Sequence, residues 1–292
     1  MASFSVIDAA LEGIRLTREK PRIVLLWGLF YIGFIVVLGL IAYATLGAHM
    51  SELVTSMRKP PTDPVAAEKL ITTALPFMSV AGPVSWVFMA MFTAAIYRRV
   101  LRPEDGPAGL RLGMDELRLL AVFALLCLVL MAMLSVLTLV DFVTAGLPDN
   151  QVSVVFSAML RAASLCATIA VLTRLSLVGA ASIAQRRIAI VEGWRLSAGH
   201  VLRLLATYLL ATALALVVLI LMQFVLGAVF MVLGGATGIV VGAPNGGPAA
   251  MAAFLVLQAF AALIATCAYV ILQAPPAAAY SALAGEAARA AA

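Results

Sequence analysis

Long uncharged apolar runs recur along this chain, and they constrain its fold more than any other feature of the sequence. Residues 23–46 alone form an uninterrupted run of 24 residues without a charged side chain. About 20 apolar residues are enough for a helix to cross the hydrocarbon core of a bilayer, whereas a signal peptide has an apolar region of only about 7–15 residues. A water-soluble fold could not bury such runs, because 64% of the 292 residues are hydrophobic and only 11% are charged. The sequence therefore predicts an all-α integral membrane protein whose first run is a retained helix.

Charged and turn-forming residues divide the apolar sequence into six spans. The long uncharged stretch toward the C-terminus is divided at Gly234, Gly235 and the turn-rich residues 243–248. The predicted spans are residues 23–46, 72–97, 119–140, 152–178, 204–233 and 249–272. Residues 1–273 thus form one transmembrane domain of six helices, and residues 274–292 form a cytoplasmic tail rich in Ala and Pro.

The distribution of basic residues orients these spans, because cytoplasmic loops are enriched in Lys and Arg. Fourteen Lys and Arg residues lie on the side that holds both termini, whereas only Arg58, Lys59 and Lys69 lie on the opposite side. The N-terminus and the C-terminus are therefore predicted to be cytoplasmic. The preference for Arg over Lys and the Ala-rich C-terminus favour a bacterial source, and thus the bacterial inner membrane. Short basic clusters between apolar runs are typical of contact with anionic lipid, and they argue against nucleic-acid binding.

A Gly-apolar-Arg-Leu tetrapeptide recurs before the first, third and fifth spans, at residues 13–16, 109–112 and 193–196. In the first of these leads, Ile7, Leu11 and Ile14 recur at helical spacing. Helices of this kind lie in the headgroup plane, with the apolar face toward the acyl chains and the basic residues toward phosphate. We interpret the chain as three helical hairpins, each preceded by a cytoplasmic interfacial amphipathic segment. The alternative is a chance match, to which apolar sequences are prone.

The residues from the end of the fourth span to the start of the fifth resemble those of a known family. Residues 174–177 are Arg-Leu-Ser-Leu, residues 192–200 are Glu-Gly-Trp-Arg-Leu-Ser-Ala-Gly-His, and Arg203 opens the next span. This stretch resembles a bacterial six-helix membrane-domain family, namely the membrane domain of glycerophosphodiester phosphodiesterases and its free-standing relatives. The chain departs from that pattern at Gly179, where proline is frequent, and at Leu202, where an aromatic residue is frequent. The resemblance implies a fold and no reaction, because it does not extend to the phosphodiesterase domain.

Arg161 is the charged residue that lies deepest in a predicted span, roughly 13 Å from the end opposite the basic loops. A charge at this depth is costly and requires a partner or a wet cavity. In one interpretation Arg161 extends outward to Asp141, and in the other it belongs to an anion or lipid-phosphate site within the bundle. Arg174 lies near the cytoplasmic boundary, where a long side chain reaches the interface. The candidate lipid-binding, anion-binding or structural residues are Arg161, Asp141, Arg174, Trp194, Arg195 and Arg203.

Enzyme chemistry has little support in the sequence. His49 and His200 fall on opposite sides of the predicted membrane and cannot share a metal ion. No nucleophile elbow, phosphate-binding loop or zinc-protease motif occurs, and every carboxylate falls outside the span cores. We therefore expect no catalytic, cofactor-binding or metal-binding residue and no cofactor.

Two functional hypotheses follow. The first is a non-enzymatic inner-membrane protein that binds anionic lipid or a protein partner and contributes to envelope organisation. The second is a transporter or export accessory for an amphipathic or lipid-like substrate, which would use Arg161 and the second span. Pro76 and Pro83 lie within that span, and proline within a membrane helix removes a backbone hydrogen bond and introduces a kink.

Overall fold

A computed structural model describes residues 5–49, 56, 63–105, 110–146, 150–237 and 248–291. Within these ranges the ordered elements are helices, and none is a β-strand. The α-helices are α1 (Val6–Glu19), α2 (Pro21–Leu46), α4 (Pro64–Leu101), α5 (Met114–Ala145), α6 (Gln151–Leu175), α7 (Leu177–Gln185), α8 (Ile190–Ser197), α9 (Val201–Thr237) and α10 (Pro248–Ala291). Two 3-10 turns, η1 (Gly47–His49) and η2 (Pro103–Asp105), follow α2 and α4.

Six of the helical segments in these ranges are long and apolar enough to cross a membrane: α2, α4, α5, α6 with α7, α9 and α10. The prediction of an all-α, multi-pass membrane protein with six spans is therefore confirmed. Local capping explains several helix boundaries. The Asp63 side chain accepts a hydrogen bond from the backbone N–H of Val65 at the start of α4, and Asn150 accepts one from Ser153 at the start of α6.

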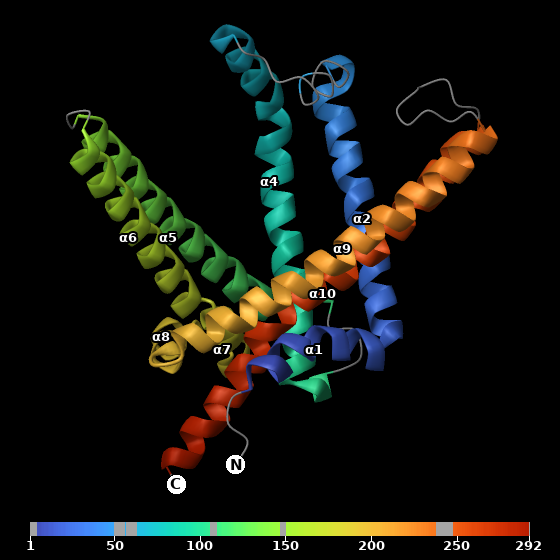
Figure 1. Ribbon diagram of the computed structural model, residues 1–292. Coiled ribbons are helices and arrows are strands. Elements are labelled where there is room, and N and C mark those ends of the chain that lie inside the picture. The colour runs from blue at the N-terminus through green and yellow to red at the C-terminus, as the bar shows by residue number, and fades with distance from the viewer. Residues whose placement is uncertain are drawn as a thin grey trace.

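The central core of the molecule lies where α1, α4, α7 and the second half of α10 meet (Figure 1). Helix α10 packs against α1, α2, α4, α7, α8 and α9, so it contacts more elements than any other described helix. Its side chains at Val270, Ala274, Ala277 and Ala279 are fully buried. Small residues at these positions allow the neighbouring helices to approach closely, as is usual for helices that associate in lipid.

Helix α10 extends beyond residue 273, where the sequence predicts that the transmembrane domain ends and a tail begins. The helix continues past Pro275 and Pro276 to Ala291, and Tyr280 and Leu283 are buried in the central core. Alanine is the strongest helix former, which helps the helix to continue despite the two prolines. Residues 274–283 thus belong to the packed centre of the described structure.

An aromatic stack joins the first pair of spans to α10. Phe34 and Phe88 stack with their ring centroids 3.9 Å apart, and Phe92 stacks on Tyr269 at 4.8 Å. The Tyr269 hydroxyl also lies 2.9 Å from the hydroxyl of the buried Thr93, so the polar group of Thr93 has a partner. Favourably arranged aromatic pairs add about 0.5–1.5 kcal/mol each beyond their buried area.

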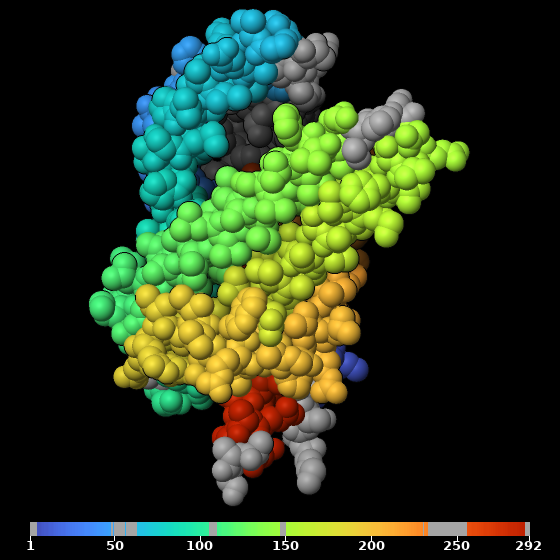
Figure 2. Space-filling view, turned by 90° about the vertical axis from the view of Figure 1, so that its left-hand side faces the viewer, coloured from blue at the N-terminus to red at the C-terminus, as the bar shows by residue number. Residues whose placement is uncertain are grey.

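Away from the central core the spans diverge. Figure 1 shows α5 and α6 leaning to one side, α9 and α10 leaning to the other, and α2 and α4 between them. Figure 2 shows α5 and α6 side by side across one face, above α8 and the start of α9. In their diverging half, α5 and α6 bury few side chains, which include Val140 and Thr144 near the end of α5. The outward faces of this pair are therefore available to lipid.

Two of the three glycines that the tetrapeptide aligns lie at close helix crossings. A Cβ atom on Gly13 of α1 would lie 2.4 Å from the Ile271 Cα of α10. A Cβ atom on Gly193 of α8 would lie 2.9 Å from the Val178 Cα of α7. Gly109 lies outside the described residues. In both crossings the glycine allows its helix to contact the backbone of the neighbouring helix, which is α10 for α1 and α7 for α8.

Candidate functional site

Arg174 and Trp194 come together at the end of α6. The guanidinium carbon of Arg174 lies 4.3 Å from the centroid of the Trp194 ring, which α8 supplies. The Trp194 ring packs on the core beside Val122 and Val178, so its position is constrained by packing. A cation over the face of a tryptophan is attracted by the ring quadrupole, by about 0.5–2 kcal/mol depending on solvation. The ring therefore holds the Arg174 side chain in one orientation.

Arg174 has no anionic partner in the part of the chain that the structure describes. Its Nε atom is buried and makes no hydrogen bond there, and no described carboxylate lies within ion-pairing distance of its guanidinium. A buried donor without an acceptor costs about 1–3 kcal/mol. The terminal nitrogens of this guanidinium are not among the buried unpaired atoms, and an anion that approached them would neutralise the charge.

The residues after Trp194 form an elbow, residues 197–200, that leads from α8 into α9. The Ser197 hydroxyl donates to the Trp194 carbonyl, and Gly199 adopts a left-handed φ of 82°, a conformation that glycine adopts without strain. The His200 carbonyl then accepts from Leu204 in the first turn of α9. The Nδ1 atom of His200 is buried and has no hydrogen-bond partner among the described residues. The elbow thus brings a second unsatisfied nitrogen to the same end of the molecule.

Arg195 and Arg203, which flank the elbow, have exposed side chains. Neither forms an ion pair with any residue that the structure describes. They contribute positive charge around the elbow without being held in place, as is common for basic residues that face anionic headgroups. Of the predicted candidates near the elbow, Arg174 and Trp194 are therefore in direct contact, and Arg195 and Arg203 are exposed and nearby in sequence.

Arg161 and Asp141 form an ion pair between α6 and α5. The Arg161 Nε atom lies 2.7 Å from the Asp141 Oδ1 atom. Both side chains are largely exposed, at 55% for Arg161 and 60% for Asp141. Asp141 is the partner that the sequence suggested for an Arg161 side chain that extends outward. The pair belongs to the exposed surface of the α5–α6 pair and is remote in sequence from the elbow.

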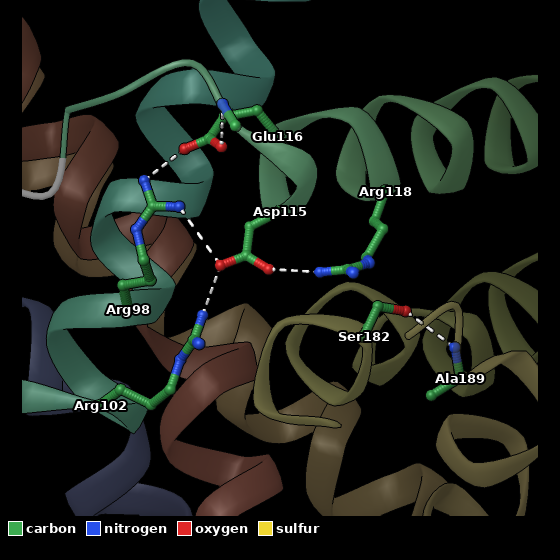
Figure 3. Close-up of polar contacts among 8 residues, drawn as sticks. Arg98, Arg102, Asp115, Glu116, Arg118, Ser182 and Ala189 are labelled. Carbon is green, nitrogen blue, oxygen red and sulfur yellow. Dashed lines mark hydrogen bonds and ion pairs between the residues drawn. The ribbon is translucent and has the colours of Figure 1, made fainter. Parts of the chain in front are cut away.

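A buried cluster of charged residues links the end of α4 to the start of α5 (Figure 3). Arg98 is only 2% exposed and pairs with both Glu116 and Asp115. The Asp115 carboxylate also lies 2.6 Å from an Arg102 nitrogen and 2.8 Å from an Arg118 nitrogen. Breaking a buried pair of this kind leaves an uncompensated charge, so the cluster locks the two helices together.

Sequence reasoning assigned these five residues to a cytoplasmic loop and did not anticipate the cluster. A signal was present, because an Asp-Glu pair opens the third apolar run and two arginines close the second. The Glu116 carboxylate also accepts a hydrogen bond from the Gly113 backbone, which caps α5 and orients the side chain toward Arg98. Both carboxylates of this cluster are paired with arginines, which favours a structural role.

The geometry offers no candidate metal site among the residues that the structure describes. Across the described ranges, no three His, Cys, Asp or Glu side chains gather closely enough to hold a metal ion.

The buried Ser182 hydroxyl, near the charged cluster in Figure 3, stabilises the corner between α7 and α8. It accepts a hydrogen bond from the Ala189 backbone N–H and donates one to the Val178 carbonyl.

Comparison with known proteins returned no family model, no curated protein and no solved structure that matches this chain. The resemblance to the six-helix membrane-domain family therefore stays a prediction. The molecule has two candidate sites among its described residues, the Arg174–Trp194 stack and the Arg161–Asp141 pair.

Proposed function

We propose that this chain is a non-enzymatic protein of the bacterial inner membrane that binds anionic lipid and contributes to envelope organisation. One observation carries the proposal. Arg174 is held against the Trp194 ring, and its guanidinium has no carboxylate partner among the described residues. A phosphate oxygen of a lipid headgroup accepts strongly from an arginine, because such charge-assisted hydrogen bonds are about twice as strong as neutral ones.

The location of the stack supports a headgroup as the ligand. Arg174 closes the fourth apolar run, so its guanidinium falls at the level where the hydrocarbon core ends and the phosphates begin. Arg195 and Arg203 add exposed positive charge near the elbow. Each basic residue near an anionic membrane surface contributes about 1 kcal/mol to attraction. The proposal places this end of the molecule, with both chain termini, at the cytoplasmic leaflet.

The amphipathic helix α1 supports an interfacial arrangement of the same end. Its small residues Ala10 and Gly13 pack on the protein, whereas Ile7 and Leu11, one turn apart, are exposed. Exposed apolar residues on a helix that also carries charged residues such as Arg15 suit the boundary between headgroups and acyl chains. In this proposal the six spans form three hairpins, and α1 and α8 lie in the cytoplasmic interface ahead of the first and the third.

Lipid retention by the purified protein tests the proposal. Native mass spectrometry of protein titrated with phosphatidylglycerol should show one tightly held lipid, and Arg174→Ala should weaken this binding by about 10-fold, the value of one charged hydrogen bond. Arg289→Ala is the matched control, since it removes an exposed arginine predicted to lie on the same side and should leave the tight binding unchanged. Equal retention by the wild type and Arg174→Ala would refute the proposed function.

The divergence of the spans favours a second candidate, a transporter or export accessory for an amphipathic or lipid-like substrate. Helix α4 contains Pro76 and Pro83, and it lies between two helix pairs that lean apart (Figure 1). Such a protein would use Arg161 to hold an anionic group of the substrate. If Arg161→Ala left both the flux of an exported solute and the folding of the protein unchanged, this candidate would be rejected.

A further inference from the structure

The ion pair between Arg161 and Asp141 leaves most of its hydrogen-bonding capacity unused. Only the Nε atom of Arg161 and one carboxylate oxygen of Asp141 take part in the bond. No other polar contact of either side chain occurs with the residues that the structure describes. The two terminal guanidinium nitrogens therefore keep four N–H donors, and the carboxylate keeps a free oxygen.

The position of the pair places it near the boundary of the bilayer opposite the basic loops. Asp141 lies four residues before the end of α5, or about 6 Å along the helix. Arg161 lies ten residues into α6, or about 15 Å, and a side chain in a helix points back toward the N-terminus, which here is the outer end. Phe142 and Leu165, which are close in sequence to the pair, are exposed and apolar. A charged pair in such surroundings needs further polar partners, since the lipid chains offer none.

We propose that the Arg161–Asp141 pair binds a phospholipid whose headgroup carries both a phosphate and a primary ammonium group. The phosphate would accept hydrogen bonds from the terminal nitrogens of Arg161, in the two-pronged geometry that a guanidinium favours. The ammonium would donate to the free oxygen of Asp141. The acyl chains would lie along the exposed apolar faces of α5 and α6.

The chemistry of the pair selects this headgroup over the common alternatives. A phosphatidylglycerol headgroup has a phosphate but no cation, so the Asp141 carboxylate repels its charge. A phosphatidylcholine headgroup has a cation without N–H donors, so it cannot hydrogen-bond to the carboxylate. Only a headgroup with both charges and free N–H donors satisfies both side chains. This site differs in chemistry and in membrane side from the anionic-lipid site proposed at Arg174, and it shares with that site only the six-span arrangement.

Lipid titration of the full-length protein tests the inference, with phosphatidylethanolamine, phosphatidylcholine and phosphatidylglycerol as probes in native mass spectrometry. The wild type should bind one phosphatidylethanolamine about 10-fold more tightly than phosphatidylcholine, the value of one charged hydrogen bond. Asp141→Asn, which keeps the shape of the side chain, should abolish this preference. Arg161→Gln should weaken phosphatidylethanolamine binding by at least about 10-fold, because it removes the donors to the phosphate.

Two controls separate this inference from folding defects and from the proposed function. Asp141→Asn and Arg161→Gln should keep the helicity and the melting temperature of the wild type, measured by circular dichroism. Both variants should also retain phosphatidylglycerol through Arg174, whereas Arg174→Ala should weaken the binding of phosphatidylglycerol and keep that of phosphatidylethanolamine.

The inference is overturned if the wild type shows no preference for phosphatidylethanolamine, or if Asp141→Asn keeps that preference. It is also overturned if the pair is covered by a second copy of the chain. That result would appear as a dimer in the mass spectrum that Asp141→Asn dissociates.

Discussion

Replacing Gly13 by alanine perturbs the crossing of α1 and α10 at its closest point. The new Cβ atom would lie 2.4 Å from the Ile271 Cα and 2.8 Å from the Val270 carbonyl oxygen. Both neighbours are backbone atoms of a buried helix, so no side chain can rotate away to make room. The two helices must separate by roughly 1 Å to reach ordinary van der Waals contact, which begins near 3.5 Å.

Overpacking of this kind costs about 1–3 kcal/mol, and a collision with backbone belongs at the upper end of that range. Alanine returns about 1 kcal/mol, because it forms helix more readily than glycine. We therefore expect Gly13→Ala to lower the free energy of unfolding by about 2 kcal/mol. For a chain of this size that loss corresponds to a decrease in melting temperature of about 4–8 °C.

Thermal unfolding of detergent-purified protein, followed by circular dichroism at a helix wavelength, measures the effect. Gly33→Ala in α2 is the matched control, because a Cβ atom there would meet nothing within 4 Å. This control should gain up to about 1 kcal/mol from helix propensity alone. If Gly13→Ala were as stable as Gly33→Ala, the close crossing of α1 and α10 would be refuted.

Three further predictions concern the charged cluster, α1 and the end of the chain. Arg98→Met should destabilise the protein by about 3–5 kcal/mol in chemical denaturation, and adding Glu116→Gln should recover part of the loss, because the stranded charge is then removed. Burial raises the pKa of the Glu12 carboxyl above its ordinary value of 4.5, so its contribution to stability is full below pH 4.5 and is lost as the pH rises through the raised pKa. Glu12→Gln should accordingly melt at a higher temperature than the wild type at pH 7 and at the same temperature near pH 4. A chain that ends at residue 273 should fail to give monodisperse folded protein in size-exclusion chromatography, whereas a chain that ends at residue 285 should elute like the wild type.

The candidate site was partly accessible from the sequence. Arg161 and Arg174 could be singled out because charges within long apolar runs are rare and costly. That Arg174 would lie on Trp194 could not be predicted, since 19 residues of intervening chain, including the α7–α8 corner, determine where the ring lies. The cluster around Arg98 was missed for a related reason. Its members flank a loop, and only the packing of α4 against α5 converts loop charges into buried ion pairs.

The number and approximate positions of the spans were determined by the sequence alone. A helix in lipid satisfies its own backbone hydrogen bonds, so the length and apolar character of each run are sufficient to predict a span. The faces through which the spans pack were decided only by the tertiary structure. These helices are apolar all round, and lipid solvates apolar surface as well as protein does, so no periodic pattern marks the packed side.

The end of α10 shows this difference most clearly. Residues 274–283 have the composition of a tail, because they are rich in Ala and contain Pro275 and Pro276. The folded chain places them among α1, α4 and α7, where small side chains permit close helix contact and Tyr280 and Leu283 are buried. Local composition determines whether a segment can form a helix in the membrane, whereas its place at the centre or the edge depends on the shapes of helices distant in sequence.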